Sequence, residues 1–145
     1  MKNFIVLLFL LTISMLQVQA TNWIQVDDKM YMDVDSIEFF VSDGQYNKRN
    51  NQYSFWVKSL NDGSDNYKQL EKHFNKKVWY SLSKYVVDIN TQKIAQKTSV
   101  LYAVNEKQPL DLYEEQFDTL LRWQTIVPNS VGELMFNIVR GKIQR

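Results

Sequence analysis

The sequence predicts an α+β fold, in which an antiparallel sheet of about six strands carries a C-terminal helix packed on one face. Two observations lead to this prediction. β-branched and aromatic residues alternate with polar ones in short runs bounded by Asn, Asp and Gly clusters, as in antiparallel strands. Near the C-terminus, a helix-capping motif precedes apolar residues at helical spacing. Consecutive strands followed by a covering helix favour the α+β class.

The alternation predicts six strands in chain order. They cover residues 23–26, 30–34, 36–41, 52–60, 77–89 and 93–104. A Ser-Asp-Gly turn at 42–44 and a polar stretch at 47–51 separate the third strand from the fourth. Within the fourth strand, Phe55 and Val57 face one side, whereas Ser54, Trp56 and Lys58 face the other. The three residues 90–92 have the length of a hairpin connection, so the last two strands are expected to pair directly.

Two segments between the strands and the C-terminal helix leave alternatives open. Tyr67, Leu70 and Phe74 are spaced i, i+3 and i+7, which indicates either a short amphipathic helix over residues 67–77 or a loop. Residues 110–123 are acidic and aromatic, and their periodicity does not decide between a helix and a loop.

The C-terminal helix is predicted over residues 131–140. Ser130 and Glu133 form a capping box, in which each side chain satisfies an unpaired backbone N–H. Gly141 stands where a helix C-terminus prefers glycine. The stripe expected to dock on the sheet consists of Val131, Leu134, Met135 and Ile138.

The first twenty residues predict a secretory signal peptide, 1–20, followed by one α+β domain, 21–145. Lys2 precedes an apolar run of about 13 residues, and small residues end the segment at Ala20. The alternative, an uncleaved anchor, would need about 20 apolar residues. We therefore expect an exported protein, periplasmic or secreted, with no integral membrane segment after cleavage.

Composition excludes several classes of protein and of site. Hydrophobic residues are 45% and charged residues 23% of the 145, so a disordered chain is not expected. Lys and Arg number 17 against 16 acidic residues, a net charge of +1, which gives no electrostatic reason to bind nucleic acid. The absence of cysteine excludes disulfides, thiol nucleophiles, Cys-based zinc sites and a lipid anchor on cysteine.

Candidate catalytic residues are few. His73 is the only histidine and lies in a charged run, where a solvated surface position is expected over a binding contact or a general base. The glycines at 44, 63, 132 and 141 are too far apart to form a phosphate-binding loop. We therefore expect no metal site, no cofactor and no catalytic residues.

Paired carboxylates are the catalytic groups that remain to be considered. A glycoside hydrolase needs two carboxyl groups about 5–10 Å apart. The pairs are Asp27/Asp28, Asp33/Asp35 and Glu114/Glu115, and solvated edges or turns are their expected positions. Asp33 does not begin an EF-hand calcium loop, because Glu38 stands at the position where that loop needs glycine. The basic pairs Lys48-Arg49 and Lys76-Lys77 are interpreted as ordinary surface.

Several segments together resemble the surface-adhesin protein E family of bacteria. They are Trp23-Ile24, KMYMDVDSI (29–37), FWVK (55–58), YSLSKYVVDI (80–89) and WQTIVPNSVGE (123–133). The resemblance covers most of the chain from Trp23 to about Val139. It implies a small secreted or surface-attached domain with about six antiparallel strands and a C-terminal helix. The namesake of the family is a lipoprotein adhesin that dimerises and binds host matrix and plasma proteins.

The chain departs from that family in two respects. Without cysteine it cannot be lipid-anchored as the namesake is. Many relatives carry a cysteine pair near the positions of Ile89 and Val139, so here packing alone must hold the helix. The matched positions are mostly apolar or capping residues, and no ligand-binding residue is carried over from the resemblance.

Three function classes follow from these observations. We favour an exported, non-enzymatic binding module, adhesin-like, that recognises a protein ligand such as a host extracellular-matrix or envelope protein through a sheet edge or an aromatic patch. A homodimer is a further expectation from the resemblance. The alternatives are a periplasmic structural or accessory domain with homotypic contacts and, last, a carboxylate-dependent hydrolase.

Overall fold

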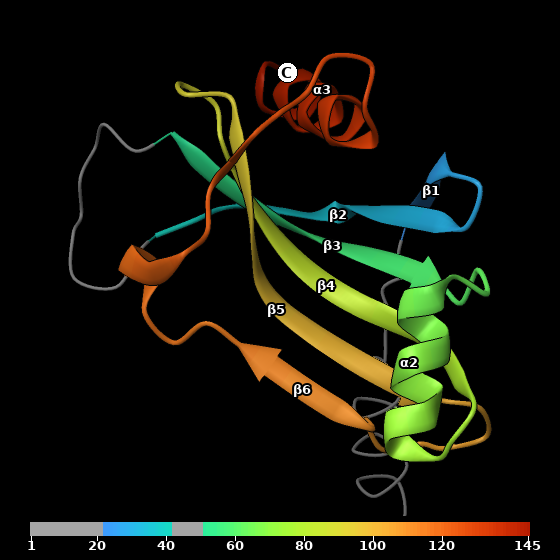
Figure 1. The fold of residues 1–145 in the computed structure, drawn as a ribbon. Helices are drawn as coiled ribbons and strands as arrows, with labels where there is room; N and C mark the ends of the chain where they lie inside the picture. Colours follow the sequence, from blue (N-terminus) through green and yellow to red (C-terminus); the bar gives the residue numbers. More distant parts are fainter. Residues whose placement is uncertain (1–21, 42–50) are drawn as a thin grey trace, which may run out of the picture.

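The computed structural model describes residues 22–41 and 51–145 (Figure 1). The predicted signal peptide, the 42–44 turn and the Lys48-Arg49 pair lie outside these residues. The strands are β1 (Trp23–Asp27), β2 (Met30–Phe39), β3 (Gln52–Leu60), β4 (Val78–Asp88), β5 (Lys93–Ala103), β6 (Asp111–Glu114) and β7 (Gln124–Thr125). The helices are α2 (Asp65–Phe74), the short 3₁₀ helix η1 (Asp118–Leu120) and α3 (Val131–Ile143).

The strands form one curved antiparallel sheet in the order β1-β2-β3-β4-β5-β6. β7 pairs with β5 beyond the end of β6, on the same edge. The predicted α+β class is therefore confirmed. The hairpin of β4 and β5 is also confirmed, and its connection is fixed by Asp88, whose Oδ1 accepts hydrogen bonds from the backbone N–H groups of Asn90 and Thr91, both at 2.9 Å.

β2 replaces the two short strands predicted at 30–34 and 36–41. Its pairing with β3 shifts between Asp33 and Glu38, so one continuous strand contains an irregularity. Ser36 bridges this point, because its hydroxyl donates to Asp33 O at 2.7 Å and accepts from Trp56 N at 2.9 Å. A side chain thus takes over ladder hydrogen bonds at the position where the alternation of the sequence breaks.

The segments left open by the sequence contain both strand and helix. Residues 65–74 form α2, which ends at Asn75 in the left-handed conformation, φ 52°. None of its residues is buried. Residues 110–123 are neither one helix nor only a loop, since they contain β6 and η1.

The main core lies between one face of the sheet and α3. It contains Met135, Phe136 and Val139 of the helix packed against Met32, Phe55, Val57 and Val87 of the strands. The apolar stripe that meets the sheet runs at intervals of four residues, through Val131, Met135, Val139 and Ile143. Leu134 therefore points outward and is 45% exposed, so its predicted place in the docked stripe is wrong.

The predicted helix end at Gly141 is wrong as well. α3 continues to Ile143, which packs against the main core. Lys142 Nζ donates to Val34 O and forms a salt bridge with Asp35 at 3.3 Å, which fixes the last turn to β2. The predicted cap by Ser130 is present, with Glu133 N donating to Ser130 Oγ at 3.2 Å. The Glu133 carboxylate accepts from Asn129 N at 2.8 Å, whereas Ser130 N donates to Val127 O, so the second half of the predicted capping box is displaced by one residue.

A second, smaller core covers part of the opposite face. Val86 points away from its neighbour Val87, because side chains alternate along a strand. It packs with Ala95 and Leu121, and with the partly buried Phe40 and Trp123. The chain between β6 and α3 thus returns across the sheet. No helix in the described part of the chain is long and apolar enough to cross a membrane.

Candidate functional site

Three aromatic side chains and one lysine form a cluster where β4 begins and β5 ends. We call this cluster, Lys58, Trp79, Tyr80 and Tyr102, the aromatic patch. Tyr80 and Tyr102 are cross-strand partners whose rings stack at 4.8 Å between centroids. Trp79 meets Tyr80 edge to face at 5.0 Å. These contacts hold each ring in one orientation relative to the next.

A bulge in β4 places Trp79 in this cluster. Val78 pairs with Ala103 and Tyr80 with Tyr102, so Trp79 is an extra residue with no partner on β5. Lys58 Nζ lies 5.8 Å from the centroid of the Trp79 ring and 4.5 Å from that of Tyr80, so the two neighbouring rings flank the same side chain. A β-bulge changes the direction in which the side chain of its extra residue, here Trp79, points. Trp79 remains 53% exposed.

The charged group of the aromatic patch is the Lys58 ammonium, which lies against the rings of Trp79 and Tyr80. Lys58 forms no salt bridge with the residues that the structure describes, and its ammonium group is held by cation–π attraction. Burial raises the pKa of the Tyr80 phenol, and the adjacent Tyr102 adds to the effect. Tyr80 therefore offers a neutral hydroxyl beside a positive charge.

A hollow of about 480 Å³ adjoins the aromatic patch between β4 and the end of α2. Leu60, Val78, Trp79 and Val104 line its apolar part, and Lys29, Asn61, Glu71 and Lys77 line its polar part. We call these four polar residues the rim of the hollow; protein interfaces likewise combine apolar and polar surface.

Glu71 joins α2 to β4 at the rim of this hollow. Lys77 Nζ donates to its carboxylate at 3.1 Å, and Asn61 Nδ2 and Val78 N donate to its other oxygen at 3.3 and 3.2 Å. The hydrogen bond from Lys77 is the main reason that the pKa of Glu71 is lowered, against a smaller opposing effect of burial. The rim is thus fixed by a carboxylate that stays ionised.

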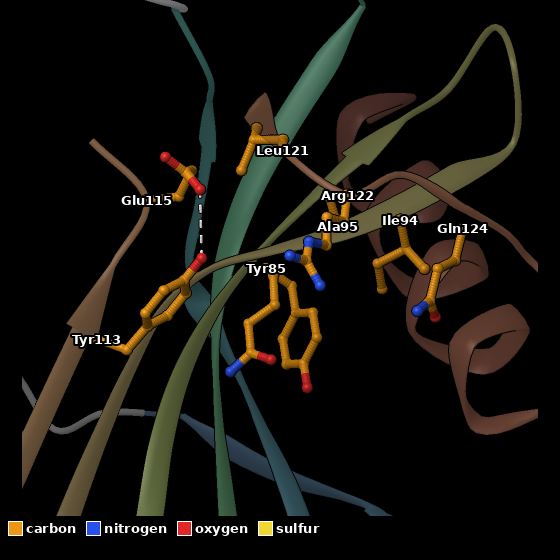
Figure 2. A pocket seen from close by; sticks show the side chains of 9 residues that line it. Tyr85, Ile94, Ala95, Tyr113, Glu115, Leu121, Arg122 and Gln124 are labelled. Atoms are coloured by element: carbon orange, nitrogen blue, oxygen red, sulfur yellow. Dashed lines mark hydrogen bonds between the residues drawn. The ribbon is translucent and has the colours of Figure 1, made fainter. Parts of the chain in front are cut away.

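A second cavity, of about 420 Å³, lies on the opposite half of the same strands, where β6 and β7 leave a gap beside β5 (Figure 2). It is lined by Tyr85, Ile94, Ala95, Gln96, Tyr113, Glu115, Leu121, Arg122 and Gln124. We call it the edge cavity. Burial raises the pKa of Tyr85, so this phenol is also neutral.

The predicted surface residues lie largely where expected. His73 is exposed near the end of α2, with its ring 4.7 Å from that of Phe74. Lys76 and Lys77 are exposed and form salt bridges with Glu106 and Glu71. These positions confirm the expected surface location of His73 and of the Lys76-Lys77 pair.

The three carboxylate pairs are separated from one another in the fold. Asp27 and Asp28 lie at the β1–β2 connection, where Asp27 Oδ1 accepts from Asp28 N at 2.8 Å. Asp33 is buried, unlike the expected solvated edge, and its Oδ1 accepts from Asp35 N at 3.1 Å, because the irregularity in β2 folds the carboxylate back on its own backbone.

The third pair divides at the end of β6, where Glu114 is exposed and Glu115 turns toward the edge cavity. Residues 33–38 belong to a strand, which agrees with the exclusion of a calcium loop. No group of three or more His, Asp or Glu residues suited to a metal ion occurs within residues 22–41 and 51–145.

The sequence predicts a sheet edge or an aromatic patch as the binding surface, but it does not predict which residues form the two sites. Trp79 and Tyr80 are adjacent aromatic residues at the start of β4, and this departure from alternation is the sequence feature that corresponds to the bulge. Arg122 and Gln124 were missed because their segment had no predicted structure. No family model matches this chain, and no curated protein matches it, so the two sites are interpreted from their own geometry.

Proposed function

We propose that this chain is an exported, non-enzymatic binding module that recognises a protein ligand through the aromatic patch, in the manner of a surface adhesin. The observation that carries the proposal is the position of Trp79, which is 53% exposed yet held in place by Tyr80 and Lys58. A large exposed ring that is already oriented loses little conformational entropy when a partner covers it.

The composition of the patch also favours a protein partner. Trp, Tyr and Arg dominate the residues that contribute most to protein–protein affinity, particularly where a central ring enters a pocket and polar groups exclude water around it. Here the exposed ring borders a hollow with an apolar part, and Glu71 and Lys77 stand on its rim. The neutral Tyr80 phenol and the Lys58 ammonium supply directional donors beside the ring.

The ionisable groups favour binding over hydrolysis. The pKa values of four described carboxyl groups, Glu38, Asp62, Glu71 and Asp88, are lowered from their ordinary values. A general acid of a glycoside hydrolase needs the opposite shift, so that its carboxyl group still carries a proton near neutral pH.

The proposed export depends on residues 1–20. Their basic start, apolar centre and small-residue end are the features of a cleaved signal peptide. The mass of the mature protein tests this directly: a chain that starts at Thr21 supports export, and a chain in the cell envelope that starts at Met1 contradicts it.

Capture of envelope and host-matrix proteins on the immobilised chain tests the proposed binding. We expect a ligand that is retained by the unaltered chain and by Phe117→Ala, and lost with Trp79→Ala. Phe117 is a matched control, since it is also an exposed aromatic residue, 63% exposed, and lies outside the aromatic patch. A ligand retained equally by all three chains would contradict the proposal.

Sedimentation velocity of the same three chains separates a foreign ligand from a second copy. A dimer that becomes monomeric only with Trp79→Ala would assign the aromatic patch to homotypic contact, which is the alternative function of a structural or accessory domain.

A further inference from the structure

The edge cavity is built by a segment that leaves the sheet and returns to it. β6 pairs with Thr98–Leu101 of β5, and β7 pairs with Lys93 and Ile94. Because Glu115 N also donates to Lys97 O at 2.8 Å, the gap in the described pairing on this edge lies beside residues 95 and 96. The chain between β6 and β7 closes over the gap, and the cavity of about 420 Å³ lies beneath it. That volume is within the range of small-molecule sites, roughly 300–1,000 Å³.

Two side chains of opposite charge, Arg122 and Glu115, line this cavity without forming a salt bridge with each other. Arg122 forms no salt bridge with any described residue, Glu115 included. In Figure 2 the Arg122 guanidinium points toward the middle of the cavity near Tyr85, whereas the Glu115 carboxylate faces Tyr113 on the other side. Tyr113 Oη and Phe117 N each donate to Glu115 at 3.3 Å, which holds the carboxylate in its position.

The remaining walls are suited to an amide-bearing ligand. Gln96 and Gln124 provide side-chain amides, of which that of Gln96 already donates from Nε2 to Ser83 Oγ at 3.2 Å, and Tyr85 provides a neutral phenol. Ile94, Ala95 and Leu121 supply apolar surface between these groups. Polar groups at fixed positions around the wall of a cavity define the orientation of a bound ligand.

We propose that the edge cavity binds a small zwitterion with a free carboxylate and a free ammonium group, as in an amino acid or a short peptide. The planar guanidinium of Arg122 receives the carboxylate through paired hydrogen bonds, and Glu115 receives the ammonium group. A ligand with both charges satisfies both side chains at once, whereas a simple anion would leave Glu115 opposing it. This site is independent of the aromatic patch and of the protein ligand proposed there.

The test uses amide chemical shifts of the ¹⁵N-labelled chain, titrated with a pool of tripeptides Gly-X-Gly in which X runs over the uncharged amino acids. We expect saturable shifts of the Ala95 and Gln96 resonances. An N-acetylated pool and a C-amidated pool should each bind at least about tenfold more weakly, because one charge-assisted contact is lost in each. Free glycine, titrated separately, distinguishes an amino acid from a peptide as the source of the zwitterion.

Matched variants assign each charge to its residue. Arg122→Gln should weaken the free pool about tenfold or more and remove its preference over the amidated pool, while Arg140→Gln, the same change on the exposed side of α3, should have no effect. Glu115→Gln should remove the preference over the acetylated pool, while Glu114→Gln should not. The dispersion of the spectra shows that each variant is folded.

The outcomes that overturn the proposal are equally specific. One is the absence of saturable shifts at Ala95 and Gln96 with both the free pool and glycine. The other is equal binding of the free and blocked pools. Trp79→Ala should leave the titration unchanged, so this site can fail or hold separately from the aromatic patch.

Discussion

The two ends of β4 differ in what covers them. Val86 and Val87, toward its C-terminal end, are 0% exposed, because α3 covers one face of the sheet there and the Leu121–Trp123 return covers the other. Trp79, near its start, is 53% exposed in the same strand. The difference divides one strand into a covered end, which contributes buried surface, and an open end, which leaves an aromatic ring exposed.

The two longer helices, α2 and α3, show the same contrast. α3 buries Met135, Phe136 and Val139, so apolar packing holds it to the sheet. α2 has no fully buried residue, although Tyr67, Leu70 and Phe74 are partly buried, and polar contacts add to its attachment. Tyr67 Oη donates to Ser59 O at 3.0 Å, and Glu71 accepts from Lys77 and Val78. Stability should therefore be concentrated at the α3 end of the sheet, and tolerance to substitution at the α2 end.

The largest stability effect is expected for Phe55→Ala in the main core. Phe55 is 0% exposed beneath α3, so truncation removes a fully buried ring and leaves a cavity, at a cost of about 3–5 kcal/mol in the free energy of unfolding. Phe117→Ala should change it by less than about 0.5 kcal/mol, as at an exposed position. Denaturant unfolding measures both, and equal effects would contradict the contrast between covered and open regions.

The next comparison concerns two neighbours in α3. Met135→Ala should destabilise the chain by about 2–5 kcal/mol, because Met135 belongs to the main core. Leu134→Ala should cost less than about 1 kcal/mol, because Leu134 is 45% exposed. Thermal or chemical unfolding of the two variants decides the orientation of the helix. A larger loss for Leu134→Ala would mean that α3 docks through a different face.

A smaller effect is expected at the start of α3. Ser130→Ala removes the hydroxyl that accepts from Glu133 N at 3.2 Å and should cost about 1 kcal/mol. The same unfolding experiment measures it. If Ser130→Ala proved more damaging than Met135→Ala, capping rather than packing would hold the helix.

The smallest effect is a dependence on pH at the β4–β5 connection. Burial acts to raise the pKa of Asp88, but hydrogen bonds from Gln52, Thr91 and Asn90 outweigh it, and the pKa is lowered below its ordinary value of 3.8. A carboxylate with a lowered pKa stabilises the fold above that ordinary value, and this contribution is lost as the pH falls through the pKa of the folded state.

Asp88→Asn should therefore lower the melting temperature near neutral pH, and its difference from the unaltered chain should shrink below about pH 4. Asp28→Asn, a change of the same kind in the exposed β1–β2 connection, is the control. If the difference in melting temperature between Asp88→Asn and the unaltered chain did not vary with pH, the shape of the side chain would matter and its charge would not.

Part of this contrast could be predicted from the sequence. β3 has the predicted bounds, 52–60, because its alternation is local and both of its neighbours pair along it. The outward position of Leu134 could not be predicted, since Leu134 and Phe136 lie on either side of Met135 and only docking against the sheet decides which is buried. The place of Trp79 in the aromatic patch could not be predicted without knowing of the bulge in β4. The edge cavity could not be predicted either, because it depends on the return of residues 115–123 to β5, which no local pattern specifies.

The central claim is that Trp79 serves binding and contributes little to stability. The direct test measures both quantities for Trp79→Ala, with the ligand obtained by capture on the unaltered chain and with Phe117→Ala as control. We expect a loss of about 2 kcal/mol or more in binding free energy, roughly 30-fold in Kd, and a change of less than about 1 kcal/mol in the free energy of unfolding. An unchanged Kd together with a loss of several kcal/mol in stability would contradict the account and make the aromatic patch part of the core.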